Sequence, residues 1–438
     1  MNAVILSIGD ELVLGQTVDT NTAYLASRLA ELGILTRYHQ TLPDNLVLIA
    51  QAIRQAADQS ELLLVTGGLG PTKDDLTRQA LAEAMGVGLE LNAESLKQIE
   101  AFFAGRSKPM SESNRVQAML PIGSQGIPNE RGTAPGIRAK LGRCDIFVMP
   151  GVPHEMRGMF EKSIVPEIQS SAGVGRIILT TKINTFGLGE SAVGQLLGDL
   201  MNRDRNPTVG TTVSGGIVSV RVRCVSNDPE KARQALEETV EQVEQRLGPI
   251  VFGRDEESLA ESLLQALRKT RRKIATAESC TGGLIGAMLT DVPGSSDVYL
   301  GGWVTYTNDM KCRELDVPEQ TIEQYGAVSG QTVCAMARGA LDTSHADIAV
   351  AVSGIAGPTG GTPDKPVGTV WIGVAEKHND TIRTRAVLSR FPGDRQAVRR
   401  RAALCALQIA RLTLLEQQST IDGMTWVNQT YSDSDDHE

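Results

Sequence analysis

Apolar and polar positions at the start of the chain follow, in turn, the repeats of strands and helices. A compact apolar run over residues 3–9 predicts a strand, and Asp19 or Thr20 is expected to cap the helical pattern behind it. The elements expected next are a strand over residues 35–40, a helix over 45–57 and a strand over 62–65. Because strands and helices alternate, this region is expected to form a parallel sheet with helices on both faces.

A glycine-rich turn follows the third of these strands. Residues 66–75 read Thr-Gly-Gly-Leu-Gly-Pro-Thr-Lys-Asp-Asp and precede another helical pattern. Ligands of such sheets gather at the carboxyl ends of the strands, where a turn rich in glycine suits a phosphate. Asp74 and Asp75 are then either carboxylates in the first turn of the next helix or ligands of a divalent cation beside a pyrophosphate. The positions expected to contact the phosphate are Gly67, Gly68 and Gly70.

The middle of the chain carries a smaller mixture of strand and helix patterns, which includes a charged amphipathic helix over residues 229–247. The patterns restart near Asp255 with apolar faces of their own. The last residues are strongly acidic and are typical of a solvated segment. The expected division is an α/β domain over residues 1–172, a small α+β connecting domain over 173–253, an α/β domain over 254–418 and a disordered tail over 419–438.

The sequence Glu-Ser-Cys-Thr-Gly-Gly at residues 278–283 lies between a strand pattern and a helix pattern. Ser279 is therefore expected at or near a helix N-terminus, where unpaired backbone N–H groups can hold an oxyanion or a phosphate. This position makes Ser279 a candidate nucleophile. The alternative is that Ser279 or Thr281 simply caps the helix. Cys280 is intrinsically the stronger nucleophile and remains a rival to Ser279.

Two later stretches carry further candidate chemistry. Tyr306 and Lys311 follow a strand pattern, and a corner between strand and helix would aim both side chains into one cleft. Residues 353–370 contain five glycines and three prolines between two strand patterns, so their backbone amides can approach an anion closely. A final helix over residues 394–415 closes the domain. The substrate contacts expected in this domain are Thr281, Gly282, Gly283, Gly354, Gly357, Gly360 and Gly361.

Composition and charge restrict the function classes. The chain is 41% hydrophobic and 22% charged, as is ordinary for a soluble globular protein, and its net charge of −9 provides no basic footprint for nucleic acid. No apolar run reaches the ~20 residues of a membrane span, and the N-terminus lacks the pattern of a signal peptide. Six single cysteines without a CxxC pair argue against a zinc site or disulfides. We expect a cytoplasmic protein with neither a nucleic-acid nor a membrane partner.

Together these motifs resemble the CinA family of competence/damage-inducible proteins over essentially the whole chain. The resemblance rests on the stretches around Ser279, Tyr306 and the glycine loop, and on Gly-Gly-Leu-Gly-Pro-Thr-Lys-Asp-Asp with Pro-Gly-Val-Pro-His-Glu-Met at residues 150–156. It implies an N-terminal three-layer αβα fold of the molybdopterin-binding type and a KH-like middle domain. Because no basic GxxG loop is found in that middle domain, it is expected to connect domains and to support a homodimer rather than to bind RNA.

The resemblance also implies an activity for each large domain. The C-terminal domain of the family hydrolyses nicotinamide mononucleotide (NMN) to nicotinate mononucleotide and ammonia without a cofactor, and its Ser, Tyr and Lys fall on Ser279, Tyr306 and Lys311. Lys311 would serve as the base if its pKa is depressed, and Tyr306 would relay a proton or orient the lysine. The N-terminal domain is associated with cleavage of ADP-ribose, for which Asp74 and Asp75 would hold Mg or Co. The alternatives are a non-catalytic recruitment protein and a molybdopterin-binding module.

Overall fold

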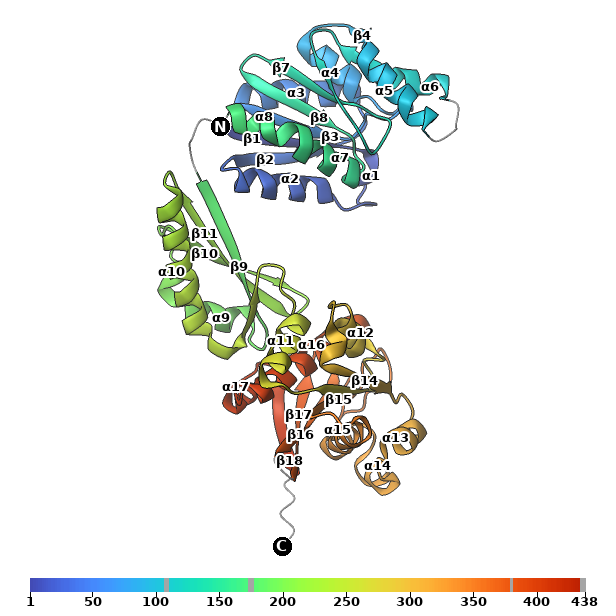
Figure 1. Cartoon of the computed structure of the whole chain (residues 1–438), viewed down its shortest axis with the longest axis vertical. Helices are drawn as coiled ribbons and strands as arrows, with labels where there is room; N and C mark the ends of the chain where they lie inside the picture. The colour runs from blue at the N-terminus through green and yellow to red at the C-terminus, as the bar shows by residue number, and fades with distance from the viewer. Residues whose placement is uncertain (106–109, 172–176, 379–380, 434–438) are drawn as a thin grey trace. The chain divides into compact units, whose positions relative to one another are not determined.

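The computed structural model describes residues 1–105, 110–171, 177–378 and 381–433 (Figure 1). The chain divides into two compact units. The first comprises Met1–Leu179 with Cys224–Arg233, and the second comprises Thr180–Arg223 with Gln234–Glu438.

The first unit is built on a six-stranded sheet in the order β2-β1-β3-β8-β7-β6. Its strands are β1 (Asn2–Ile8), β2 (Leu35–Leu42), β3 (Leu62–Thr66), β6 (Gln125–Ile127), β7 (Gly136–Leu141) and β8 (Cys144–Met149). Strands β2, β1, β3 and β8 are parallel, whereas β7 and β6 are antiparallel to their neighbours. The parallel arrangement predicted for the first three strands is confirmed, and β7 and β6 add an antiparallel edge that the prediction did not cover. A two-residue turn with Gly142 at φ 60° joins β7 to β8, and so short a connection forces an antiparallel pair.

Helices cover both faces of this sheet, as the sequence predicted. The helices are α2 (Thr20–Glu31), α7 (Pro153–Met159) and α8 (Val165–Ser171) on one face and α3 (Leu46–Gln59) and α4 (Thr77–Met85) on the other. Strand β1 is buried on both faces, with Ile5 in one core and Val4 in the other. Peripheral elements are α1 (Asp10–Val13), β4 (Leu89–Leu91), α5 (Ala93–Ala104), α6 (Glu112–Arg115) and β5 (Met119–Pro121).

The middle segment forms a four-stranded sheet with helices against it. The strands, in the order β10-β11-β9-β12, are β9 (Ile177–Thr185), β10 (Thr208–Ser214), β11 (Ile217–Ser226) and β12 (Val251–Arg254). The helices are α9 (Glu190–Leu197) and α10 (Pro229–Leu247), the latter with the bounds expected from its amphipathic pattern. Val240, Val243 and Leu247 of α10 are buried in the small core of this sheet.

A second six-stranded sheet, in the order β14-β13-β15-β16-β17-β18, forms the C-terminal domain. Its strands are β13 (Ile274–Glu278), β14 (Tyr299–Val304), β15 (Ile348–Gly354), β16 (Thr369–His378), β17 (Thr381–Arg390) and β18 (Val427–Asp433). Strands β14, β13 and β15 are parallel and the others antiparallel. Its helices are α11 (Leu259–Thr270), α12 (Leu284–Thr290), α13 (Asn308–Leu315), α14 (Glu319–Tyr325), α15 (Gly330–Ser344), α16 (Arg395–Leu414) and α17 (Gln418–Asp422).

The end of the chain departs from the sequence-based expectation. Residues 419–433, predicted to belong to a disordered tail, instead form most of helix α17 and the edge strand β18, which pairs with β17. Trp426 packs against Phe186 and Phe391, with ring centroids 5.3 and 6.0 Å away. The acidic residues are concentrated at the very end, whereas the preceding apolar side chains gain burial against the core. Residues 434–438 of the predicted tail lie outside the described residues.

The middle and C-terminal segments share one core. Phe186 and Phe252 from the middle segment are buried among the side chains of α11 and α16. Arg411 of α16 donates hydrogen bonds to the carbonyl oxygens of Pro249 and Val251 at 2.9 and 2.7 Å. Burial lowers the pKa of the Arg411 guanidinium. The middle segment is therefore packed onto the C-terminal domain rather than tethered to it by a free linker.

Candidate active sites

The turn at residues 279–283 connects the buried strand β13 to helix α12. Gly282 and Gly283 have φ of 60° and 89°, a left-handed conformation that glycine adopts without strain. Helix α12 begins at Leu284 with Gly283 as its N-cap residue and without a side-chain cap. The alternative that Ser279 or Thr281 caps this helix was therefore wrong.

The first backbone amides of α12 instead donate their hydrogen bonds to Glu278, a residue that was not among the predicted site residues. Its carboxylate is buried and accepts hydrogen bonds from the amides of Ile285 and Gly286 at 3.1 and 2.9 Å. Its carbonyl oxygen accepts from the amide of Thr305 at 2.8 Å. Because these bonds span both ends of the turn, Glu278 fixes the backbone that carries Ser279.

Ser279 and Lys311 are brought together beyond the carboxyl ends of the neighbouring parallel strands β13 and β14. Lys311 Nζ lies 3.2 Å from Ser279 Oγ, and the two side chains are 1% and 8% exposed, respectively. Lys311 Nζ also donates to the carbonyl oxygen of Thr305 at 3.0 Å and approaches that of Thr307 at 3.5 Å. Thr307 caps helix α13, so Lys311 projects from the first turn of that helix towards the end of β13.

Burial lowers the pKa of the Lys311 ammonium, because the charged form loses hydration. A neutral amine at this position would donate its two N–H bonds to these carbonyl oxygens and direct its lone pair towards the serine hydroxyl. The arrangement is that of a nucleophile with an adjacent base.

Cys280 lacks the surroundings of a reactive thiol. Its side chain is buried, and burial raises the pKa of the thiol to about 12. Reactive cysteines are partly exposed and have a lowered pKa, so the structure favours Ser279 over Cys280 as the nucleophile.

The Tyr306 hydroxyl contacts helix α16. Its side chain is 58% exposed, and its hydroxyl accepts a hydrogen bond from Arg395 Nη2 at 2.9 Å. Among the hydrogen bonds of the described residues, none joins the Tyr306 side chain to Ser279 or Lys311. The corner that precedes α13 thus directs backbone carbonyls towards Lys311 and the tyrosine ring towards helix α16.

Two arginines of α16 complete this region. Arg399 donates to the carbonyl oxygens of Cys280 and Thr281 at 3.2 and 2.6 Å, and Arg395 donates to that of Gly357 at 2.8 Å. They lie four residues apart and therefore on one face of the helix. From its sequence this helix was expected only to close the domain, although its N-terminal half is rich in arginine.

The glycine loop between β15 and β16 is anchored at several points. Lys365 Nζ donates to the carbonyl oxygens of Tyr325 and Val328 at 3.1 and 2.8 Å. Added Cβ atoms at Gly354 and Gly361 would collide with Val370 and Val367, so packing explains these two glycines. Gly357 and Gly360 have positive φ values of 83° and 88°, which shape the loop that meets Arg395.

The N-terminal glycine turn borders a cavity of about 500 Å³ at the carboxyl ends of β1, β3 and β8. Four carboxylates line the cavity besides Asp75: those of Glu11, Asp44, Asp74 and Glu155. Burial, together with the charges of Asp10, Glu11 and Asp74, raises the pKa of the Asp44 carboxyl. The phosphate-contact candidates that line this cavity are Gly67, Gly68 and Gly70.

The residues present do not fit the expected divalent-cation site. Asp75 accepts hydrogen bonds from the amides of Gly70 and Thr72 at 2.7 and 2.9 Å and from the Thr72 hydroxyl, so its oxygens already brace the turn. Asp74 is exposed, and its pKa is lowered by a hydrogen bond from Thr72. Both precede α4, which begins at Thr77, so the expectation that they lie in its first turn was also wrong. Within the described ranges, no group of three or more His, Cys, Asp or Glu side chains is arranged so that it could hold a metal ion.

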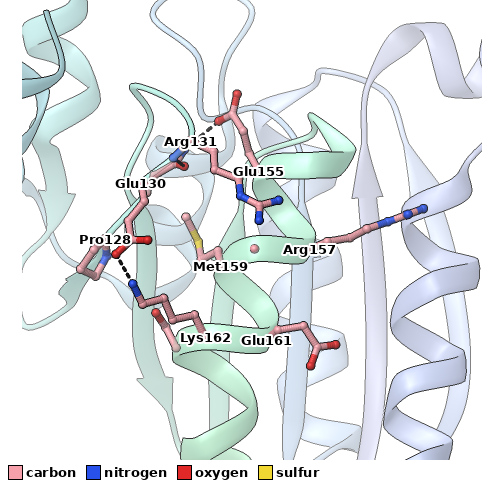
Figure 2. Close-up of a pocket in the computed structure, with 11 residues that line it drawn as sticks. Pro128, Glu130, Arg131, Glu155, Arg157, Met159, Glu161 and Lys162 are labelled. Atoms are coloured by element: carbon pink, nitrogen blue, oxygen red, sulfur yellow. Dashed lines mark hydrogen bonds and ion pairs between the residues drawn. The ribbon is translucent and has the colours of Figure 1, made fainter. Parts of the chain in front are cut away.

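A second cavity of about 570 Å³ lies beside the first, between the loop at residues 128–131 and the helix that continues from α7 (Figure 2). Glu155 lines both cavities and accepts a hydrogen bond from Asn129 at 2.7 Å. Lys162 and Glu130 form an ion pair across the second cavity, as Figure 2 shows. Charges that pair with each other in this way do not point to a ligand.

These observations define a multidomain α/β protein with a glycine-lined cavity in its first domain and a buried serine–lysine pair in its last. Family models match three successive parts of the chain. A probable molybdopterin binding domain matches residues 4–170, the damage-inducible protein CinA KH domain 180–253, and the CinA C-terminal domain 256–414.

The chain belongs to the CinA family. It is 42% identical over 416 residues to a CinA-like protein of Dictyoglomus thermophilum, a match that covers 95% of this chain and 100% of the relative. A putative competence-damage inducible protein of Symbiobacterium thermophilum is 40% identical over 422 residues, 95% of this chain and 99% of the relative. The fold is correspondingly mixed α/β, with an N-terminal domain of the molybdopterin-binding type and a KH-like middle domain.

Among solved structures, the chain is similar to the protein CinA with unknown function from Thermoplasma acidophilum. The identity is 31%, the match covers 38% of this chain and 97% of that one, and the TM-score is 0.36. A competence/damage inducible protein from Agrobacterium tumefaciens matches with 41% identity over 36% of this chain and 93% of that one, with a TM-score of 0.34. Within the described residues, no helix combines the length and the apolar character that crossing a membrane requires.

Proposed function

We propose that the C-terminal domain hydrolyses the carboxamide of NMN to nicotinate mononucleotide and ammonia. The observation that carries this proposal is the 3.2 Å approach of Lys311 Nζ to Ser279 Oγ in a buried setting that lowers the lysine pKa. Amide hydrolysis needs a nucleophile with a base beside it, and this pair supplies both. Family membership adds support, because the serine and lysine assigned to this reaction fall on these residues.

The reaction would proceed in two steps. Neutral Lys311 accepts the proton of Ser279 as Oγ bonds to the amide carbon, and the tetrahedral intermediate collapses when Lys311 returns that proton to the leaving nitrogen, which departs as ammonia. Water then attacks the acyl-serine with Lys311 as base, which releases the carboxylate and restores the serine hydroxyl.

Backbone amides of the turn are the expected oxyanion donors. The amide of Ser279 donates to the carbonyl oxygen of Val352, and that of Gly282 to the carbonyl oxygen of Ser279. The remaining candidates in the turn are therefore the amides of Cys280, Thr281 and Gly283. Arg399, which binds the carbonyl oxygens of Cys280 and Thr281, holds this backbone in place.

The phosphate of the nucleotide would lie near Arg395 and the glycine loop. Among the hydrogen bonds of the described residues, Arg395 uses two of its five N–H groups, on Gly357 and Tyr306, so the other three can contact an anion. Glycines at positions 357 and 360 leave the loop backbone open to close approach. No metal or cofactor takes part in this proposal.

The test is ammonia release from NMN by the purified full-length protein, with Lys311→Arg as the matched variant. Arginine keeps a long side chain with N–H donors but cannot serve as the base, since guanidinium stays protonated. Turnover by the wild type and loss in the variant would support the proposal. A folded wild-type protein that releases no ammonia would refute it and favour a non-catalytic recruitment role.

A second activity is proposed for the N-terminal domain, cleavage of the pyrophosphate of ADP-ribose. It is favoured by the glycine turn at the carboxyl end of β3, which borders a cavity large enough for a nucleotide. Because the described residues form no ready metal site, the assay compares ADP-ribose cleavage with and without a chelator. Equal rates would remove Mg and Co from the proposal, and absence of cleavage under both conditions would refute the activity.

A further inference from the structure

The position of the Tyr306 hydroxyl is difficult to reconcile with a proton-relay role. The hydroxyl accepts a hydrogen bond from Arg395 at 2.9 Å, and a second amino group of that guanidinium binds the carbonyl oxygen of Gly357. A relay needs hydrogen-bond contact with the groups that exchange the proton. The nearest such groups, on Ser279 and Lys311, are occupied by each other and by backbone carbonyls.

The backbone on either side of Tyr306 is nevertheless held next to the reacting pair. The residues on either side of it supply the carbonyl oxygens that contact Lys311 Nζ, at 3.0 Å from Thr305 and 3.5 Å from Thr307. Arg395, which anchors its hydroxyl, lies one helical turn before Arg399, which binds the turn of Ser279. The tyrosine therefore extends from the corner that holds the base to the helix that holds the nucleophile turn.

The Tyr306 side chain is both anchored and exposed. Tyr306 is 58% exposed although its hydroxyl is fixed. A fixed ring that remains accessible at the edge of a buried catalytic pair offers a flat surface to a ligand. Aromatic faces are negative at their centres, so they favour cationic partners.

We infer that Tyr306 is the binding platform for the positively charged pyridinium ring of the substrate, and that it selects oxidised nicotinamide nucleotides over neutral ones. This inference rests on the proposed deamidase function. The amide-bearing ring of NMN is a cation, whereas the dihydropyridine ring of its reduced form is neutral. A tyrosine face would therefore bind the oxidised form more tightly, while Arg395 at the hydroxyl end keeps the ring in place.

The test compares Tyr306→Phe and Tyr306→Leu with wild type in the full-length chain. Phenylalanine keeps the ring but loses the anchor to Arg395, so KM for NMN should rise about 2–5-fold. Leucine removes the aromatic face, so KM should rise about 5–30-fold, the range expected for a cation–π contact of this kind. In both variants kcat should stay within about threefold of wild type. The inhibition constant of reduced NMN should change less than about twofold.

Two results would overturn the inference. A kcat more than 100-fold lower in Tyr306→Phe, with KM unchanged, would make the hydroxyl a catalytic group. If Tyr306→Leu weakens the binding of NMN and of reduced NMN equally, the side chain only lines the site and does not select for the charged ring. Thermal melting of both variants checks that they fold, which the exposure of Tyr306 leads us to expect.

Direct binding separates this inference from the proposed deamidase activity. Calorimetric titration of NMN and reduced NMN into Ser279→Ala, with and without Tyr306→Leu, needs no turnover. If wild type releases no ammonia but NMN binding depends on the aromatic ring, the inference stands and the deamidase proposal fails. If wild type is active but binding is indifferent to Tyr306, the inference fails alone. If NMN is neither bound nor hydrolysed, both are refuted.

Discussion

Replacing Lys311 with methionine tests the base and its burial in one variant. Methionine fills a similar volume but cannot accept the Ser279 proton, so turnover of NMN should fall by about 10²–10⁴-fold, as is usual when a general base is removed. Lys311 is 1% exposed and contacts the carbonyl oxygens of Thr305 and Thr307. The loss should therefore appear in kcat with little change in KM.

The same substitution should change how stability depends on pH. Burial lowers the pKa of Lys311 in the folded protein, so the unfolded chain binds the proton more tightly. Wild-type stability is therefore fully retained above the unfolded lysine pKa of about 10.4 and is lost as pH falls towards the folded pKa. Each pKa unit between the folded and the unfolded state corresponds to about 1.4 kcal/mol of unfolding free energy. Lys311→Met has no such pH-dependent contribution. The variant should therefore become more stable relative to wild type as pH falls from the unfolded to the folded pKa of Lys311.

Denaturant unfolding at several pH values and ammonia release at saturating NMN provide the two measurements. The wild-type rate should also rise with pH and level off below the pKa of a free lysine, because only the neutral amine is a base. If the Lys311→Met variant retains more than a tenth of the wild-type kcat, the role of Lys311 as the base is refuted. Parallel curves of stability against pH for the two proteins would refute the depressed pKa.

Three further predictions concern other parts of the chain. Ser279→Ala should abolish ammonia release whereas Cys280→Ala should retain it, since the thiol is buried and its pKa is raised; the opposite result in folded variants would make the protein a cysteine amidase. Asp75→Asn should lower the melting temperature of the first domain, because an amide cannot accept all the bonds that brace the turn at Gly70; an unchanged melting curve would contradict this role. Trp426→Ala should cost about 3 kcal/mol of unfolding free energy by removing ring packing on Phe186; a loss below about 0.5 kcal/mol would indicate that the chain end is not docked.

Local patterns predicted most elements well. Asp19 caps α2 through the amide of Thr22, and the amphipathic helix over residues 229–247 has the bounds that its spacing gave. Caps and helical spacing depend on side chains a few residues apart, so a short stretch of sequence suffices to recognise them. The direction of β7 and β6 did not follow from the sequence, because the same apolar pattern suits both orientations.

The expected tail illustrates a different difficulty. Composition indicated a solvated end for residues 419–438, but Trp426 finds an aromatic partner in Phe186, far away in the sequence. Burial against a distant partner outweighed the polar average of the stretch. The two aspartates after the glycine turn were likewise recognised as notable, yet only the hydrogen bonds of Asp75 identify it as a brace of the loop.

The sequence by itself determined the family, the order of the domains and the candidacy of Ser279 and Lys311, because these depend on motifs contiguous along the chain. Only the tertiary structure decided that the two side chains meet at 3.2 Å, that burial lowers the lysine pKa and that Tyr306 turns towards Arg395 instead. A pKa depends on how much water surrounds the group, and that follows from packing between strands, helices and loops distant in sequence. For the same reason the arginines of α16 acquired a role only once the fold placed them against the serine turn.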